Sequence, residues 1–209
     1  MSEPTDPQPR LMRAELYRHH GRFADALSDL EAASLISPEL RTVNYLRGLI
    51  YLDAGHYAEA EAVLRKFLAS EPVHPAGHEA RARALLQLGH PLDAAREYDL
   101  AIEQQPVPIP DHYYERASAY GAAGDEHLEQ AIRGIDAGIA VMGPISGLER
   151  VAIDLELRRG DTDAALARLG RITQRSPRRE AWLARRGEIL IQAGRPDEAK
   201  QSFALALAA

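Results

Sequence analysis

The chain has 209 residues, of which 45% are hydrophobic and 27% are charged, so it is long enough for one compact domain or one repeat array, and its composition argues against disorder. Its formal net charge of −6 provides no overall basic surface for nucleic acid or anionic lipid. The sequence contains no cysteine, which excludes disulfides, thiol chemistry and zinc–thiolate sites.

The N-terminal segment, MSEPTDPQPR, lacks the apolar region of a signal peptide, and we expect residues 1–6 to be flexible. No apolar run approaches the roughly 18 residues needed to span a bilayer, so no membrane insertion is predicted. As given, the chain is expected in the cytoplasm, with the periplasm left open for a trimmed chain. Only two of the 25 basic residues are lysine, a composition that suggests a bacterium with a GC-rich genome.

Six glycines divide the sequence into units of about 34 residues: Gly21, Gly55, Gly89, Gly124, Gly160 and Gly194. In five units an alanine follows the glycine by five residues, and in four of these a proline follows the alanine by twelve, at Pro38, Pro72, Pro106 and Pro177. Apolar residues recur between these marks at intervals of three and four, which predicts amphipathic helices. Each unit is therefore predicted to be a helix, a glycine turn, a second helix and a proline stop. The predicted units cover residues 7–40, 41–74, 75–108, 109–145, 146–179 and 180–209.

The pattern resembles the tetratricopeptide repeat family over nearly the whole chain. A small residue stands in the middle of the first helix at Ala14, Gly48, Ala82, Ala117 and Gly187, and an aromatic residue follows by three at Tyr17, Tyr51 and Tyr120. The resemblance implies an all-α, right-handed superhelical solenoid of about six helix-turn-helix units. It also implies a concave groove lined by the first helix of each unit.

Two units depart from the pattern. In the fourth, seven residues instead of five separate Gly124 from Ala131, which predicts a longer turn. In the fifth, Ile153 and Glu156 stand where a small residue and an aromatic residue are expected. An apolar stripe, formed by Leu148, Val151, Ala152 and Leu155, lies one position earlier. We therefore expect the first helix of the fifth unit to be rotated or shifted.

The paired histidines in RHHGRFADALSDLEAA suggest a metal or catalytic site, but His19 and His20 end a helix, where side chains are usually exposed. His74 and His78 have the i, i+4 spacing of metal ligands, yet Pro75 breaks the helix between them. No catalytic triad and no glycine-rich phosphate loop can be assembled from the sequence. We predict no enzyme activity, no metal and no cofactor.

Repeat arrays of this kind present extended surfaces that bind peptides or helices of other proteins. The family's groove positions map onto Leu11, Glu15, Arg18, Tyr45, Leu49, Leu52, Asp53, Glu79, Arg83, Leu86, Tyr114, Ser118, Arg150, Asp154, Arg185 and Glu188. The predicted partner-binding site comprises Tyr45, Leu49, Leu52, Asp53, Glu79, Arg83, Tyr114, Arg150 and Asp154. Tyr45 and Tyr114 are its expected anchors, although any of these residues, the leucines above all, can instead pack against a neighbouring helix.

Two further features bear on the partner. The lysine and asparagine residues with which one subclass of the family clamps a peptide carboxylate are replaced by Leu11, Glu15 and Leu46, so that mode is not supported. A basic cluster suits either an acidic partner or simple solvation. It comprises Arg168, Arg171, Arg175, Arg178, Arg179, Arg185 and Arg186.

The leading hypothesis is a non-enzymatic adaptor or scaffold that holds a protein or peptide segment in its groove. The alternative is a structural subunit that forms homo-oligomers through its C-terminal repeat, where Phe203, Leu205 and Leu207 are expected at an open edge. That edge is equally expected if the chain is part of a longer protein. An accessory to a separate enzyme is a third reading that the sequence does not distinguish from the first.

Overall fold

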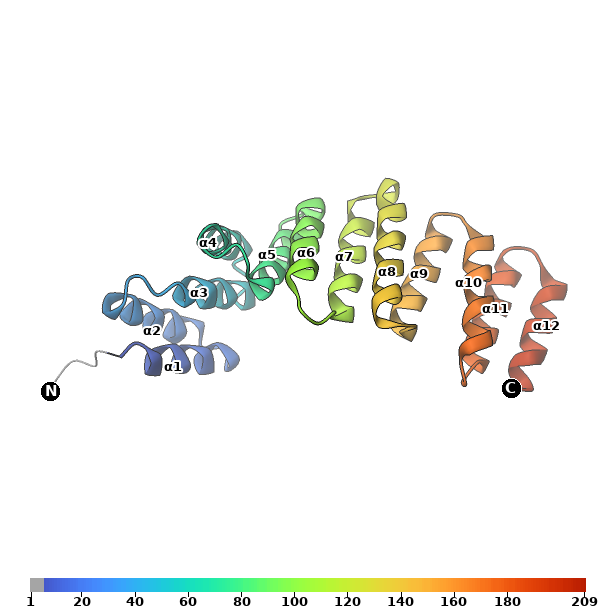
Figure 1. The fold of residues 1–209 in the computed structure, drawn as a ribbon, viewed down its shortest axis with the longest axis horizontal. Helices are drawn as coiled ribbons and strands as arrows, with labels where there is room; N and C mark the ends of the chain where they lie inside the picture. Colours follow the sequence, from blue (N-terminus) through green and yellow to red (C-terminus); the bar gives the residue numbers. More distant parts are fainter. Residues whose placement is uncertain (1–5) are drawn as a thin grey trace. The chain divides into compact units, whose positions relative to one another are not determined.

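The computed structural model describes residues 6–209, which form twelve α-helices and one 3₁₀-helix, with no β-strand in that range (Figure 1). Part of the N-terminal segment expected to be flexible, residues 1–5, lies outside the described residues. The helices are α1 (Gln8–His19), α2 (Phe23–Ile36), α3 (Thr42–Asp53), α4 (Tyr57–Ser70), α5 (Pro75–Gln87), α6 (Pro91–Gln104), α7 (Pro110–Ala123), η1 (Asp125–His127), α8 (Leu128–Met142), α9 (Ser146–Arg158), α10 (Thr162–Arg175), α11 (Glu180–Gln192) and α12 (Pro196–Leu207). The prediction of an all-α helical repeat protein is confirmed.

Each predicted repeat contains one pair of helices, here called the A helix and the B helix. The A helix ends at a turn glycine, and five of these glycines have φ between 70° and 84°, a region that residues with a Cβ rarely adopt. The B helices α2, α4, α6 and α10 each end two residues before the proline predicted to stop them. Proline also disfavours helical geometry in the residue before it, which explains the constant offset.

The described residues fall into two compact units, the first ending at Ala123 and the second running from Gly124 to Ala209. The boundary lies at the turn of the fourth predicted repeat. There Gly124 has φ of 139° and ψ of 165° and leads into η1, which forms the longer turn that the sequence predicts.

Within each unit, alanine lets the two helices of a repeat approach closely. The alanine five residues after each turn glycine is fully buried at Ala26, Ala60, Ala94, Ala165 and Ala199. Larger side chains four residues later fill the space beside them, and Leu30, Leu64, Tyr98 and Leu169 are also fully buried. Burial of each such larger side chain contributes roughly 1.5–3 kcal/mol to stability.

The expectation of a rotated or shifted helix in the fifth repeat is met only in part, because α9 buries Leu148 and Ala152 of the expected stripe as well as the positions of the repeat pattern. Ile153 is 1% exposed and Glu156 is 4% exposed, so both occupy the buried positions of the repeat pattern. Val151 and Leu155, members of the expected stripe, are only half-buried. Glu156 is accommodated in the core because it is paired there with Arg168 of α10, at 2.7 Å.

Candidate functional site

The A helices line a cavity in each unit. In the first unit, a cavity of about 380 Å³ is bordered by α3, α5 and α7, and by Tyr57 and Tyr98 from the B helices α4 and α6. We call it the acidic cavity because three carboxylates and one guanidinium line it. Its lining residues are Leu52, Tyr57, Glu79, Arg83, Leu86, Gln87, Tyr98, Asp111, His112 and Glu115.

The hydrogen bonding of the acidic cavity is incomplete. His112 Nε2 lies 3.2 Å from Glu79 Oε2, but the buried His112 Nδ1 has no partner among the described residues. The hydroxyl of the fully buried Tyr98 is also unpartnered there. Burial raises the pKa of the Glu115 carboxyl, and the nearby Asp111 and Glu79 raise it further against the opposing effect of Arg83.

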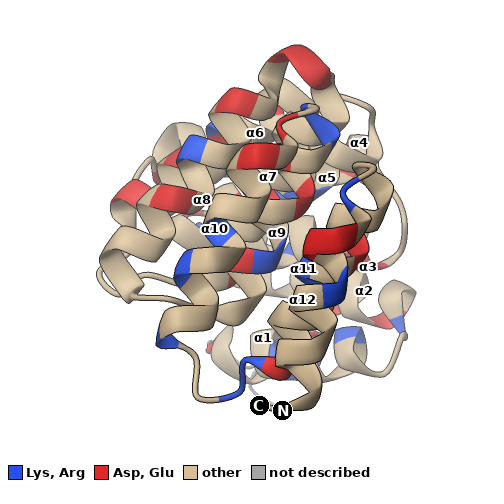
Figure 2. Cartoon of the chain, turned by 90° about the vertical axis from the view of Figure 1, so that its right-hand side faces the viewer, with Lys and Arg blue, Asp and Glu red and all other residues tan. Residues whose placement is uncertain are grey.

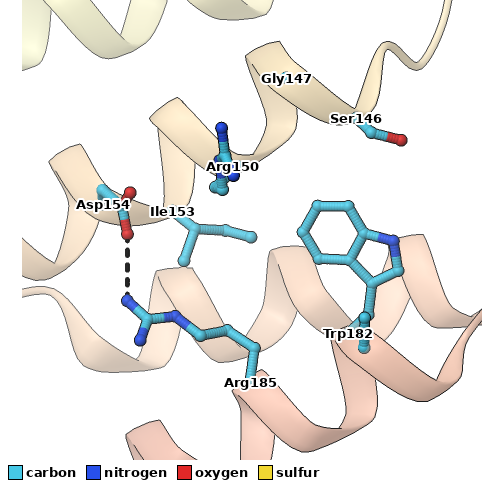
Figure 3. Close-up of a pocket in the computed structure, with 8 residues that line it drawn as sticks. Ser146, Gly147, Arg150, Ile153, Asp154, Trp182 and Arg185 are labelled. Carbon is cyan, nitrogen blue, oxygen red and sulfur yellow. Dashed lines mark hydrogen bonds and ion pairs between the residues drawn. The ribbon is translucent and has the colours of Figure 1, made fainter.

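In the second unit, a cavity of about 450 Å³ lies between α9 and α11 (Figure 3). We call it the tryptophan cavity, after the only tryptophan in the sequence. Its lining residues are Ser146, Gly147, Arg150, Ile153, Asp154, Ala181, Trp182 and Arg185. Arg185 Nη2 donates a hydrogen bond of 3.1 Å to Asp154 Oδ1, and Ile153 lies between this pair and the Trp182 indole in Figure 3. The exposed Arg150 forms no hydrogen bond or ion pair with any residue from 6 to 209.

The structure places the predicted site residues in several locations. Leu52, Glu79 and Arg83 line the acidic cavity, and Arg150 and Asp154 line the tryptophan cavity.

The two expected anchors differ from each other. Tyr45 borders a separate cavity of about 130 Å³ and lies against Phe67 and His74, with ring centroids 5.5 and 4.7 Å away. Burial raises the pKa of its hydroxyl. Tyr114 is 46% exposed, and Leu49 packs into the hydrophobic clusters on both of its sides.

The predicted acidic residues of the groove are already engaged with neighbouring A helices. Asp53 of α3 accepts a hydrogen bond from Arg18 of α1, Glu79 of α5 faces His112 of α7, and Asp154 of α9 accepts from Arg185 of α11. These contacts fix one A helix to the next. They leave Asp111 and Glu115 in the acidic cavity and Arg150 in the tryptophan cavity for a ligand.

Charge is distributed differently over the two units. Residues 1–123 contain 12 Lys and Arg against 18 Asp and Glu, whereas residues 124–209 contain 13 of each. Figure 2 shows acidic segments on α6, α7 and α8 and basic segments on α10. The predicted basic cluster is only partly available to a partner, because Arg168 is 6% exposed and is paired with Glu156 and Asp136.

Residues 6–209 contain no group of three His, Asp or Glu side chains that could hold a metal ion. None of the helices in that range is long and apolar enough to cross a membrane. His74 precedes α5 and accepts a hydrogen bond from the Gly77 amide, while His78 is buried and bound to Glu97 at 2.7 Å.

Sequence reasoning missed the residues that give each cavity its chemistry. Trp182 lies in the first turn of α11, outside the groove positions of the repeat pattern, and its being the only tryptophan was the available signal. Tyr98 lies at a core position of the repeat, and His112 and Glu115 carry no motif. Their convergence depends on packing between repeats, which no local spacing reveals.

The repeat geometry agrees with comparisons of the sequence. Two family models described as tetratricopeptide repeat match residues 45–108 and 156–209. The chain belongs to the tetratricopeptide repeat family. No curated protein matches its sequence.

Solved tetratricopeptide repeat structures share the fold. A tetratricopeptide repeat protein from Parabacteroides merdae ATCC 43184 is 18% identical, with a TM-score of 0.61 over 99% of this chain and 80% of that one. Residues 41 to the end of MamA from Desulfovibrio magneticus RS-1 are 17% identical, with a TM-score of 0.68 over 83% and 96%. A thermophilic tetratricopeptide repeat protein from Thermus thermophilus is 18% identical, with a TM-score of 0.54 over 89% and 100%. At these identities the likeness concerns the fold alone.

Proposed function

We propose that this protein is a non-enzymatic adaptor whose A helices hold an extended or helical segment of another protein. The tetratricopeptide repeat fold supports a protein–protein interaction scaffold in general. The observation that carries the specific proposal is the tryptophan cavity. Its volume of about 450 Å³ is within the usual range of ligand sites, and it combines an indole with the guanidinium of Arg150, which has no partner among residues 6–209.

The tryptophan cavity suits an apolar side chain followed by an acidic one. Trp182 provides apolar surface, and aromatic residues bury a large area at small entropic cost. Arg150 is free to bind a carboxylate, while Asp154 holds Arg185 in place. The partner segment would therefore bury one apolar residue against the indole and place a carboxylate near Arg150.

The charged groups of the groove support binding rather than catalysis. Asp53, Glu79 and Asp154 each form a contact with the neighbouring A helix. A general base must instead lie within hydrogen-bonding distance of a nucleophile or substrate proton. These carboxylates therefore act as links between repeats in the proposed adaptor.

Because Trp182 is the only tryptophan, its fluorescence reports on the cavity directly. The test begins with selection of dodecapeptides from a random phage-displayed library on the full chain. Selected peptides are then synthesised and titrated while the tryptophan emission is recorded. We expect a saturable change in emission and at least a tenfold weaker affinity in the variant Arg150→Glu.

Arg171→Glu is the matched control, because Arg171 is exposed on α10 and does not line the tryptophan cavity. Tyr45→Ala and Tyr114→Ala examine the two anchors expected in the first unit. Some peptides could bind without changing the emission and with an affinity that Arg150→Glu, Tyr45→Ala and Tyr114→Ala leave unchanged. That result would exclude the groove as the binding site.

Self-assembly is the second candidate, and exposed apolar side chains on the last two helices favour it. Ile191 is 52% exposed, Phe203 36%, Leu205 56% and Leu207 91%. Light scattering at increasing concentration should then give a mass above the 23.0 kDa of one chain, and Leu205→Ser with Leu207→Ser should restore the monomer. Leu35→Ser, at the 81% exposed Leu35 of α2, is the control. A constant 23.0 kDa mass would exclude this candidate.

A further inference from the structure

The acidic cavity has two buried polar atoms that lack a hydrogen-bond partner in the described part of the chain. The Tyr98 hydroxyl and His112 Nδ1 belong to side chains that are 0% and 5% exposed, and both side chains line the cavity. Buried polar groups are nearly always hydrogen-bonded, because an unsatisfied one loses its interactions with water and gains nothing in return. The two atoms are therefore candidates for hydrogen bonds to a polar group of a ligand in the cavity.

For a neutral His112 ring, its contact with Glu79 indicates the kind of polar group. Its Nε2 faces the Glu79 carboxylate, which can only accept a hydrogen bond, so Nε2 carries the proton. In the neutral ring Nδ1 is then an acceptor, and the Tyr98 hydroxyl can accept as well. Both atoms are thus satisfied by a group that donates several hydrogen bonds.

The charges of the cavity favour a donor that is also a cation. Glu79, Asp111 and Glu115 stand against Arg83 alone, a formal sum of −2 when His112 is neutral. The carboxylates of Asp111 and Glu115 have no hydrogen bond or ion pair with any described residue. Burial, together with the carboxylates of Asp111 and Glu79, raises the pKa of Glu115, so its charge is poorly compensated. A cation placed there would relieve this repulsion.

We propose that the acidic cavity binds the positively charged side chain of a lysine or arginine in the partner segment, with Glu115 and Asp111 as counter-ions and Tyr98 and His112 as hydrogen-bond acceptors. The proposal rests on the adaptor function above and gives it a chemical preference. Lysine carries three N–H donors and arginine five, and neither accepts a hydrogen bond. The negative charge of the first unit, with 12 basic and 18 acidic residues, attracts the same kind of segment.

The first test uses small cations and needs no known partner. n-Butylammonium chloride and n-butylguanidinium chloride are titrated into the full chain while the ring resonances of His112 and Tyr98 are followed by NMR. Sodium butyrate and sodium chloride at equal ionic strength are the controls. We expect saturable shifts with the two organic cations only, and an affinity at least fivefold weaker in Glu115→Gln.

Glu103→Gln is the matched control variant, because Glu103 is exposed on α6 and does not line the acidic cavity. It should bind both cations like the native chain. No shift with either cation, an equal shift with butyrate, or equal affinity in Glu115→Gln and the native chain would overturn the proposal.

The second test distinguishes a protein side chain from a free amine. In each peptide selected on the full chain, lysine and arginine residues are replaced singly by acetyl-lysine and by citrulline respectively. Replacement at one peptide position should weaken binding at least tenfold in the native chain but less than twofold in Glu115→Gln. That difference would show that the replaced side chain and Glu115 are energetically coupled. Peptides that bind through Trp182 without such a position would overturn this inference and leave the adaptor function intact. If no peptide binds but the small cations do, the adaptor function fails, and so does the assignment of a protein side chain.

Discussion

Arg168 of α10 donates hydrogen bonds of 3.0 and 2.7 Å, from Nε and Nη2, to the same oxygen of Glu156 in α9. Both side chains are buried, with 6% and 4% exposure. Glu156 occupies the position where three other repeats have the aromatic residues Tyr17, Tyr51 and Tyr120. An ion pair therefore replaces an aromatic contact in the core of the fifth repeat.

Arg168→Met is expected to lower the free energy of unfolding by about 3–5 kcal/mol, because it leaves Glu156 and Glu149 buried without their counter-ion. The double variant Arg168→Met, Glu156→Leu should lose less than the single variant, since leucine stands at the equivalent positions 85 and 190. Urea unfolding followed by circular dichroism measures both. A double variant less stable than Arg168→Met would contradict the explanation.

The sequence predicted the architecture well because its strongest signals are local. Glycine and proline fix where helices end, and the spacing of alanines fixes which face is buried. Prediction from the sequence failed where polar side chains are buried in the core. The third residue after the repeated alanine is buried and polar in four repeats, at Asp29, Glu97, Arg168 and Ser202. A hydrophobicity pattern treats such positions as surface, and their partners are known only from the packed structure.

The candidate site was predicted less completely for the same reason. Groove positions located Leu52, Glu79 and Arg83 at one cavity and Arg150 and Asp154 at another. The alignment of the sequence to the repeat pattern, which located these residues, contains no information on which charged side chains form ion pairs. It also places Tyr98 in the core, where its ring is, without showing that the hydroxyl lacks a partner among the described residues.

Gly48→Ala is expected to destabilise the protein even though alanine occupies the equivalent positions 14, 82 and 117. An added Cβ would lie 2.5 Å from Cγ of Leu64, which is fully buried and cannot move away. Overpacking of this kind costs roughly 1–3 kcal/mol, which outweighs a gain in helix propensity of about 1 kcal/mol. Thermal and urea unfolding should show a net loss of about 1 kcal/mol.

Gly170→Ala in α10 is the control for that substitution. Its added Cβ has no atom within 4 Å, so the propensity gain is unopposed and the variant should gain roughly 0.5–1 kcal/mol. If Gly48→Ala is as stabilising as Gly170→Ala, the close contact with Leu64 does not limit the side chain at this position.

His78 should make stability depend on pH. Burial opposes its protonation, but hydrogen bonds to Glu97 at 2.7 Å and to the Pro72 carbonyl at 2.9 Å outweigh burial and raise its pKa. Because the folded state binds this proton more tightly, the contribution is fully present below the unfolded pKa of about 6.5 and is lost as the pH rises through the folded pKa. The stability difference between native chain and His78→Gln should therefore be larger at pH 5.5 than at pH 8.5.

Urea unfolding at both pH values measures that difference, and taking the difference between variants cancels the titration of the other histidines. His20→Gln, at an exposed position after α1, is the control for the substitution itself. A difference that grows from pH 5.5 to pH 8.5 would mean that His78 is neutral in the folded protein.

Tyr98→Phe should separate stability from binding. The variant keeps the buried ring but removes a hydroxyl that has no partner among the described residues, so the free energy of unfolding should rise by about 1 kcal/mol. The same change should weaken binding of n-butylammonium in the acidic cavity, because one acceptor is lost. Tyr120→Phe is the matched control: its hydroxyl lies 3.4 Å from Asp99 Oδ2, so its removal should lower stability by roughly 0.5–1 kcal/mol. A Tyr98→Phe chain that is less stable than the native one would mean that the hydroxyl is already satisfied without a ligand. The acidic cavity would then lose one of the two buried acceptors on which the proposed cation binding depends.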